Sequence, residues 1–412
     1  MNILHLMRAG AILLVSLAGL LAWADDGNPP VVNSWDFETI QAAIDQAPSP
    51  SIVLLPPGDV VVDEPLRLRD GVILDGQGST VIRPSDAKVG IPFTASPDAI
   101  SEPITFTRLQ ANQVRLRTSG QVQVGDLVRI GLPDGDYWVS EVVGTQGASV
   151  SFADSLPSRG RLGMMEILNP IEKSGLRNLT IVDSKNPFWL SGTRNLVLDN
   201  IRIEANALYS VIDQSYRVTV RALSKFKVNA GLAVFSSNQI VVEDSLVDQH
   251  AFAGIFLRSA FNTAVQNVQI IGRPELTPDS GLTGDGITIY RGEGIRVSQV
   301  QVRDTSCYGT WITEGVDISY TDVSVNNSLT HSFYAVDSVG VSFVRCRSSL
   351  NRNGWGFVLV NNQNITLRHN LAQRVPLGFF LMGNAGGRWQ RNVSHQNEFP
   401  DYFEGNLNID GL

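Results

Sequence analysis

The chain has 412 residues, of which 43% are hydrophobic and 17% charged, with 37 glycines and 19 prolines. This composition is that of a folded globular protein and excludes a disordered or collagen-like chain. The formal net charge of −8 argues against nucleic acid or an anionic membrane surface as the main partner. Cys307 and Cys346 are the two cysteines, too few for a disulfide scaffold.

Residues 1–24 have the pattern of a secretory signal peptide. Arg8 precedes the apolar run from Ala11 to Ala22, and Ala22-Trp23-Ala24 supplies a cleavage site with small residues at the required places. No later apolar stretch approaches the ~20 residues that a membrane span needs. We therefore expect a protein that is exported to the periplasm or secreted, without a membrane span.

Residues 25–99 are predicted to form an N-terminal cap and the first coils of a repeating fold. Asp36 is expected to cap a short helix. One face of this helix would carry Phe37, Ile40, Ile44 and Ala47. Such a helix can cover the unpaired strand edge at the open end of a coil. The first strands are predicted within residues 52–58 and 72–78.

Residues 100–165 interrupt the repeat. Short alternating strands with Gly-containing turns are predicted at 104–109, 114–117, 127–130, 137–143 and 150–152. This pattern indicates a small β insertion that leaves an early coil. It either walls a substrate groove or decorates the fold, and the sequence favours neither.

The remainder, 166–412, repeats with a period in the low twenties. The first apolar position of the unit falls at Leu179, Leu196, Val218, Ile240, Thr263, Ile295, Ile318, Val341 and Ile365. Each unit contains three short strand-like pieces and no helical stripe, and the consensus of leucine-rich repeats is absent. The pattern predicts an all-β, right-handed parallel β-helix of about ten or more coils of 22–23 residues, stacked ~4.8 Å apart.

Three segments at the start of this fold carry a family resemblance. The segment from Phe37 to Ile44, followed by Leu55-Pro56-Pro57-Gly58 and Leu74-Asp75-Gly76-Gln77-Gly78, resembles the cap and opening coils of the pectate-lyase-like β-helix superfamily. The resemblance implies the fold. It leaves activity open, because the superfamily includes lyases, hydrolases, epimerases, esterases and phage tailspikes.

Stacking places equivalent residues of successive coils above one another, so the repeat predicts a polar stripe that flanks the third strand of each coil. The column before that strand is predicted to hold His250, Asp285, Cys307, His331 and Asn353. The column after it is predicted to hold Arg258, Tyr290 or Arg291, Glu314 and Asp337. One spacing of 32 residues indicates an insertion of about nine residues around 272–280, directly before Asp285. A loop on a rigid scaffold often carries function, so this is the predicted site.

We predict catalytic roles for five of these residues: His250, Asp285, Tyr290, Arg291 and His331. Substrate binding is predicted for Arg258, Trp311, Glu314, Asp337, Arg352 and Trp355. Each also has a structural alternative. The histidines and Asp285 suit tight turns, and the arginines and acids suit a salt-bridge ladder.

Gly284-Asp285-Gly286 and Thr330-His331-Ser332 are similar to fragments of the polygalacturonase pattern, but the coil between them lacks that family's pair of aspartates. Lyase or C5-epimerase chemistry needs a base, an acid and a cation beside a uronate carboxylate, which these residues can supply. The predicted function is therefore a lyase or C5-epimerase acting on an acidic polysaccharide. A glycoside hydrolase and a non-catalytic polysaccharide-binding β-helix are the alternatives.

No metal or cofactor is predicted, and the oligomeric state is left open. Calcium is conceivable through Asp279, Asp285, Glu314 and Asp337, but no loop of fixed ligand spacing supports it. Two further predictions are structural. Cys346 should point into the core. A side-chain ladder is predicted for Asn200, Asn267, Asn370 and Asn392.

Overall fold

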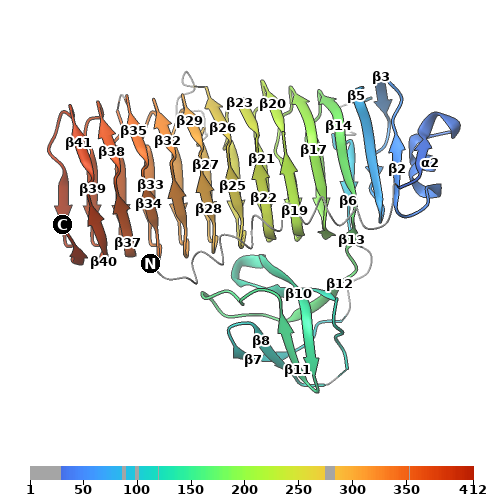
Figure 1. Cartoon of the computed structure of the whole chain (residues 1–412), viewed down its shortest axis with the longest axis horizontal. Helices are drawn as coiled ribbons and strands as arrows, with labels where there is room; N and C mark the ends of the chain where they lie inside the picture. The colour runs from blue at the N-terminus through green and yellow to red at the C-terminus, as the bar shows by residue number, and fades with distance from the viewer. Residues whose placement is uncertain (1–28, 86–89, 98–101, 119, 274–283, 352) are drawn as a thin grey trace.

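The computed structural model describes residues 29–85, 90–97, 102–118, 120–273, 284–351 and 353–412. It is a long parallel β-helix from which one β insertion projects sideways (Figure 1). The predicted all-β fold and its repeat are confirmed. The predicted signal peptide and most of the loop before Asp285 lie outside the described residues. None of the described helices is long and apolar enough to cross a membrane.

One wall of the rod, sheet B, carries the third strand of each coil. Its parallel strands are β4 (Leu66–Arg67), β6 (Phe93–Ala95), β15 (Phe188–Ser191), β18 (Ser210–Asp213), β21 (Leu232–Phe235), β24 (Ile255–Arg258), β27 (Ile287–Tyr290), β30 (Thr310–Thr313), β33 (Phe333–Val336), β36 (Phe357–Val360), β39 (Phe379–Met382) and β42 (Tyr402–Glu404).

The other walls form a larger parallel sheet, sheet A. Its strands are β1 (Val31–Asn33), β2 (Ser51–Leu54), β3 (Gly58–Val62), β5 (Val72–Pro84), β13 (Ile171–Glu172), β14 (Gly175–Val182), β16 (Thr193–Arg194), β17 (Val197–Glu204), β19 (Tyr216–Arg221), β20 (Ser224–Phe226), β22 (Asn238–Glu243), β23 (Leu246–His250), β25 (Ala264–Gln266), β26 (Gln269–Gly272), β28 (Arg296–Ser298), β29 (Gln301–Arg303), β31 (Ser319–Thr321), β32 (Ser324–Asn326), β34 (Ser342–Val344), β35 (Arg347–Ser349), β37 (Gln363–Arg368), β38 (Leu371–Gln373), β40 (Ala385–Gln390), β41 (Val393–His395) and β43 (Leu407–Asp410).

The core lies inside the coil and is built from alternate residues of each strand. In sheet B the register stacks Leu257 on Ile289 and then on Ile312, and all three are fully buried. Their neighbours along the strands therefore point outward, as the two-residue period of a strand requires. Cys346 is buried in this core, as predicted, and both cysteines are free.

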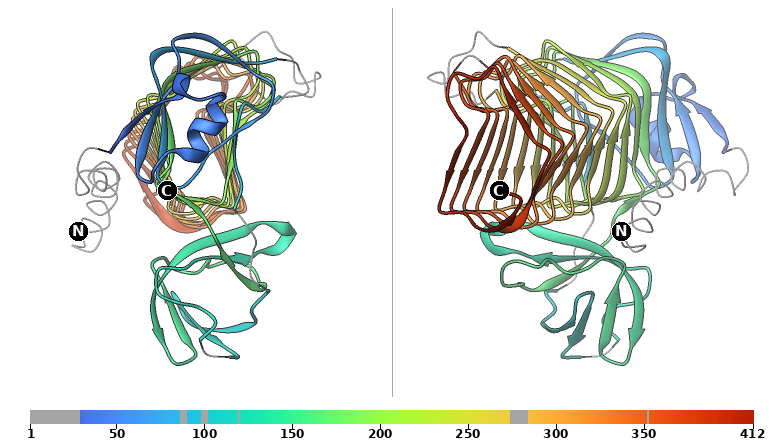
Figure 2. Two further views of the ribbon diagram at one scale, coloured as in Figure 1. Left: turned by 90° about the vertical axis from the view of Figure 1, so that its right-hand side faces the viewer. Right: turned by 60° about the vertical axis from the view of Figure 1, so that its left-hand side comes forward.

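The N-terminal end of the rod is covered by the short helix α2 (Ile40–Gln46) (Figure 2). Its N-cap is Thr39, whose Oγ1 accepts a hydrogen bond from the Ala42 N–H (3.0 Å), and not Asp36 as predicted. Asp36 ends the preceding 3₁₀ turn η1 (Ser34–Asp36). Thr39 takes the cap because its extended backbone directs the hydroxyl at the first turn of the helix.

The register corrects one spacing of the repeat. Leu179 pairs with Ile201, whereas Leu176 pairs with Leu198, so Leu179 belongs to the second strand of its coil and not to the first. β14 runs through both strands as one element, and the bend between them is at Asn178 (φ 54°).

The four predicted asparagines all make side-chain contacts between coils, but in two columns and not in one. Asn200 Nδ2 donates to Asn178 Oδ1 (3.0 Å), and Asn267 Nδ2 donates to Asp244 Oδ1 (2.6 Å). Asn370 and Asn392 do form a ladder, with Asn370 Nδ2 donating to Asn392 Oδ1 (3.0 Å). Asn200 and Asn267 lie one position earlier in their coils, at φ of 52° and 51°. They supply the left-handed residue of the turn, a conformation that asparagine tolerates better than most residues.

The insertion is a separate antiparallel sheet of β7 (Phe106–Gln110), β8 (Gln113–Leu116), β9 (Leu127–Gly131), β10 (Tyr137–Gln146), β11 (Ser149–Phe152) and β12 (Met165–Leu168), with the turn η2 (Pro133–Gly135). It docks along the corner where sheet B ends. The buried Asp154 carboxylate accepts hydrogen bonds from Tyr216 Oη (2.9 Å) and Gln239 Nε2 (2.7 Å) of the rod. The insertion therefore borders the outer face of sheet B along one edge.

Candidate functional site

The outer face of sheet B carries a run of rings that we call the aromatic strip. Its members are Tyr308, Trp311, His331, Tyr334, Trp355, Phe380 and Tyr402. Two columns produce it. Hydrogen bonds between adjacent coils align Tyr308, His331 and Trp355 just before the strands, and the strand register aligns Trp311 with Tyr334.

The rings stack on one another along the rod. Ring centroids are 5.2 Å apart for Tyr308 and Tyr334, 5.2 Å for His331 and Trp355, and 4.7 Å for Trp355 and Phe380. Because the rings face their neighbours, they turn their edges away from the sheet. The strip therefore presents hydroxyl and imidazole groups beside apolar ring edges.

His331 is held in one tautomer. Its Nδ1 accepts the Trp355 N–H (3.2 Å), so the ring proton resides on Nε2. Burial lowers the pKa of His331 to about 4, so the ring is neutral at pH 7. His331 therefore offers Nε2–H as a hydrogen-bond donor on the strip.

Asp285 shares the column of Tyr308 and His331, as the predicted stripe required, but its side chain is buried (1% exposed). Its carboxylate accepts hydrogen bonds from Thr288 Oγ1 (2.9 Å) and Tyr308 N–H (3.1 Å). Burial raises the pKa of Asp285 to about 6 in spite of these donors. A carboxyl group in this range can take up or release a proton near neutral pH.

His250 does not join this group. It lies in a different column, fully buried inside the coil, where its Nδ1–H donates to the Phe252 carbonyl (2.7 Å). Burial lowers the pKa of His250 to about 4. Cys307 and Asn353 also lie outside the column, because each of them comes shortly before the aligned Tyr308 or Trp355.

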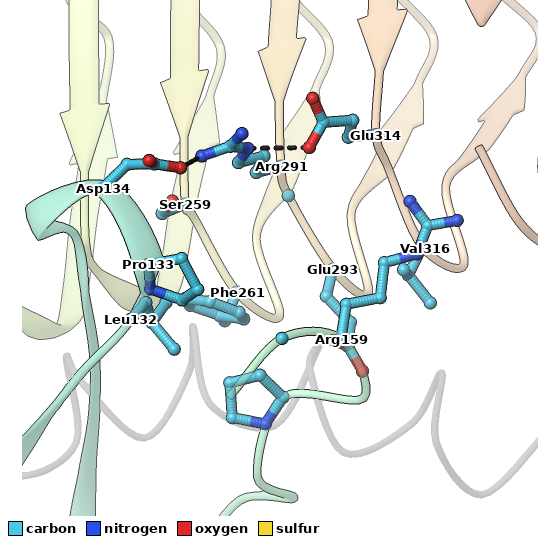
Figure 3. Close-up of a pocket in the computed structure, with 13 residues that line it drawn as sticks. Leu132, Pro133, Asp134, Arg159, Ser259, Phe261, Arg291, Glu293, Glu314 and Val316 are labelled. Carbon is cyan, nitrogen blue, oxygen red and sulfur yellow. Dashed lines mark hydrogen bonds and ion pairs between the residues drawn. The ribbon is translucent and has the colours of Figure 1, made fainter. Parts of the chain in front are cut away.

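The predicted arginines lie at the opposite end of the strands and are paired with acids. Arg258 lies 3.1 Å from Asp136 of the insertion. Arg291 binds Asp134 of the insertion and Glu314, whose Oε2 lies 2.8 Å from Arg291 Nε. Arg258 and Arg291 thus form salt bridges, which is the structural alternative given above for these arginines. Two of the acids in these salt bridges, Asp134 and Asp136, come from the insertion (Figure 3 shows Asp134).

The backbone explains why these charges leave the outer face of the sheet. Arg291, Glu314 and Asp337 have φ of 56°, 52° and 50° and form the left-handed turn after each strand. Tyr290, one residue earlier, points outward with its ring 5.8 Å from the Arg258 guanidinium and 4.8 Å from that of Arg291. Arg258 aligns with Tyr290 and not with Arg291.

Trp311, His331 and Trp355 are thus brought together, whereas His250, Arg258 and Arg291 are not part of the strip. Arg352 and Asp279 lie outside the described residues. Within the described part of the chain, no group of three or more His, Cys, Asp or Glu side chains is placed to hold a metal ion.

Sequence reasoning did not assign Phe380 and Tyr402 to the site. The repeat could have found them, because the column that contains Trp311 and Tyr334 continues at intervals of 22 to 24 residues through Val358 to Phe380 and Tyr402. It also missed the acids of the insertion. No local signal marks those acids, because their partners lie more than 100 residues away.

No protein-family model and no curated protein matches the sequence. Solved structures match the fold. The tailspike gp61 of Pseudomonas phage phi297 is 12% identical, with a TM-score of 0.61 over 89% of this chain and 72% of the tailspike. The A-module of the mannuronan C-5 epimerase AlgE6 from Azotobacter vinelandii is 12% identical, with a TM-score of 0.60 over 92% of this chain and 98% of the module.

The periplasmic alginate epimerase AlgG is 9% identical, with a TM-score of 0.54 over 93% of this chain and 83% of that structure. At such identities the likeness concerns the fold. The chain shares the right-handed parallel β-helix fold of these structures.

Proposed function

We propose that this protein binds an extended polysaccharide along the aromatic strip, with the polymer parallel to the rod. The observation that carries the proposal is the ladder of rings, which repeats a tyrosine, tryptophan, phenylalanine or histidine edge at successive coils. Rings with polar tips suit carbohydrate, which presents apolar C–H groups beside hydroxyls. A repeating surface suits a repeating ligand.

The fold and the first residues support the same proposal. Two of the similar structures are named as epimerases of mannuronan or alginate. The signal-like residues 1–24 support export, where such polymers occur. We propose an acidic polysaccharide as the ligand class.

Lyase or C5-epimerase chemistry is the second candidate, favoured by the raised pKa of Asp285. In this chemistry the ionised Asp285 carboxylate would take the C5 proton of a uronate. An epimerase returns a proton from water to the opposite face of C5. A lyase instead forms a C4–C5 double bond and breaks the bond to the 4-oxygen, which leaves with the electron pair and takes up a proton from water. Tyr308 and His331 Nε2–H would donate hydrogen bonds to the uronate carboxylate, because Arg258 and Arg291 are already paired.

Two observations favour binding without turnover. Asp285 is 1% exposed, and the strip itself contains no carboxylate. An inverting hydrolase is disfavoured for the second reason, since it requires two carboxyl groups on either side of the bond.

The test incubates the purified protein with a panel of polyuronates and neutral glycans. Absorbance of unsaturated uronate, reducing ends and NMR of C5 configuration report lyase, hydrolase and epimerase activity, and affinity electrophoresis reports binding. We expect retention by at least one polysaccharide. Tyr334→Ala should weaken retention at least several-fold, whereas Trp189→Ala, an exposed ring on the same sheet but outside the strip, should leave it unchanged. Equal retention of both variants would overturn the proposal.

If turnover is found, it should rise with pH through about 6, because Asp285 acts as a base when ionised. Asp285→Asn should abolish turnover and preserve retention. Turnover that survives in Asp285→Asn would remove Asp285 from the reaction.

A further inference from the structure

A small pocket lies between the insertion and the turns that follow sheet B, at the end of the strands away from the Tyr308 column (Figure 3). Its volume is about 190 Å³. Pro133 and Phe261 supply apolar walls, and Arg159, Glu293 and Glu314 supply charge. Arg159 and Pro133 belong to the insertion, and Phe261, Glu293 and Glu314 belong to the rod.

Arg159 differs from the other arginine of this pocket. Arg291 is occupied by Asp134 and Glu314. Arg159 donates one hydrogen bond, from Nη1 to the Asp337 carbonyl (3.1 Å), and has no carboxylate partner among the described residues. A guanidinium has five N–H donors in a fork that matches a carboxylate, so most of this group is available to a ligand.

The remaining polar groups of the pocket accept hydrogen bonds. Glu314 and Asp134 both bind Arg291, so these three side chains together carry one net negative charge. An anionic ligand is therefore attracted to Arg159 and not to Arg291. Glu293 Oε2 accepts the Ser158 N–H (2.9 Å), and burial raises the pKa of Glu293.

A ligand that satisfies this pocket carries one carboxylate for Arg159, hydroxyls for the acidic acceptors and an apolar face for the ring walls. A uronic acid residue has all three. The Asp337 carbonyl that fixes Arg159 comes three residues after Tyr334 of the strip, in the turn that follows β33, so the two residues lie within about 10 Å along the chain. A sugar in the pocket can therefore belong to the polymer on the strip.

We propose that Arg159 binds the carboxylate of a uronic acid residue in the pocket between the insertion and the rod. The inference rests on the proposed polysaccharide binding and assigns its preference for acidic sugars to the insertion. Arg159 is thus a specificity-determining residue, in place of the paired Arg258 and Arg291.

The test measures Kd by titration calorimetry for short oligogalacturonates and oligomannuronates and for the same oligomers with their carboxylates reduced to alcohols. Wild type should prefer an acidic form, because a charge-assisted contact is lost on reduction. Arg159→Gln should weaken binding of that acidic form roughly 10-fold or more and leave the reduced form unchanged. Arg159→Lys should restore part of the preference. Arg161→Gln, an exposed arginine two residues away, is the matched control.

A preference for the acidic oligomer that persists in Arg159→Gln would overturn the inference. Equal binding of acidic and reduced forms by wild type would also overturn it, and with it the proposed acidic ligand class, while leaving polysaccharide binding along the strip intact. Binding of neither form would overturn both. Circular dichroism of each variant separates a local effect from loss of the fold.

Discussion

At the scale of single residues, two buried histidines hold opposite tautomers. His250 must carry its proton on Nδ1, because its partner is the Phe252 carbonyl, whereas His331 must carry it on Nε2. Burial lowers the pKa of both to about 4. Unfolding releases imidazoles that bind a proton below pH 6.5, so these groups make the folded state less stable as pH falls from 6.5 toward 4.

Asp285 acts in the opposite direction. Its pKa is about 3.8 when unfolded and about 6 when folded, so its contribution to stability is full below pH 3.8 and is lost as pH rises through 6. Asp285→Asn should raise the free energy of unfolding by about 1–3 kcal/mol at pH 8, since the amide still accepts the Tyr308 N–H and the Thr288 hydroxyl can turn to accept from the amide nitrogen.

Thermal unfolding of wild type and variant at pH 4 and pH 8 checks this prediction. At pH 4 the wild-type carboxyl is protonated, so the gain should disappear. Asp337→Asn, at an exposed position, should change neither value. An equal shift of Asp285→Asn at both pH values would mean that packing, and not ionisation, sets the cost.

At the scale of elements, stacked turns share hydrogen bonds through identical side chains. Asn384 donates to the Leu359 carbonyl (2.9 Å) and to Asn406 Oδ1 (3.0 Å), and it accepts from the Asn362 N–H (2.9 Å). Each amide thus satisfies its own turn and the next one. Such a ladder specifies the register of the coils, since a shift by one residue would leave several buried groups unpaired.

Asn384→Ala should lower the free energy of unfolding by about 3 kcal/mol, because it leaves the buried Asn362 N–H without its partner and removes the hydrogen bonds to the Leu359 carbonyl and to Asn406 Oδ1. Chemical denaturation measures the change. His395→Ala, at an exposed position on a nearby coil, should stay within about 0.5 kcal/mol of wild type. A loss no larger than that of the control would show that water replaces the amide at no cost.

At the scale of the whole molecule, the insertion and the rod meet through polar groups that are far apart in sequence. Asp154 is buried at this junction with hydroxyl and amide donors, and Arg258 and Arg291 bind acids of the insertion on the rod's outer corner. Fixed docking gives the face of sheet B a wall along one edge.

Tyr216→Phe tests whether the docking is fixed. It removes the hydroxyl that donates to Asp154 and accepts from Gln239 Nε2 (3.0 Å), which should cost about 1–3 kcal/mol. Faster hydrogen exchange and proteolysis confined to β9 and β10 would report loosened docking. Tyr402→Phe, on the last coil, should leave the insertion unchanged. Unaltered exchange in Tyr216→Phe would place the docking energy elsewhere.

The sequence by itself determined the β-helix, its period, the capping helix and five of the six strands of the insertion, because alternation and spacing are local properties of the chain. It missed β12, which extends the insertion past its predicted end at residue 165 to Leu168. The tertiary structure decided which side chains share a surface. Tyr290 lies on the outer face and Arg291 in the turn, so a prediction that is wrong by one residue places a side chain on the wrong surface. A contact such as that of Arg258 with Asp136 joins residues that are 122 positions apart in the sequence. Such placements depend on how coils stack and where the insertion docks, and no local pattern encodes either.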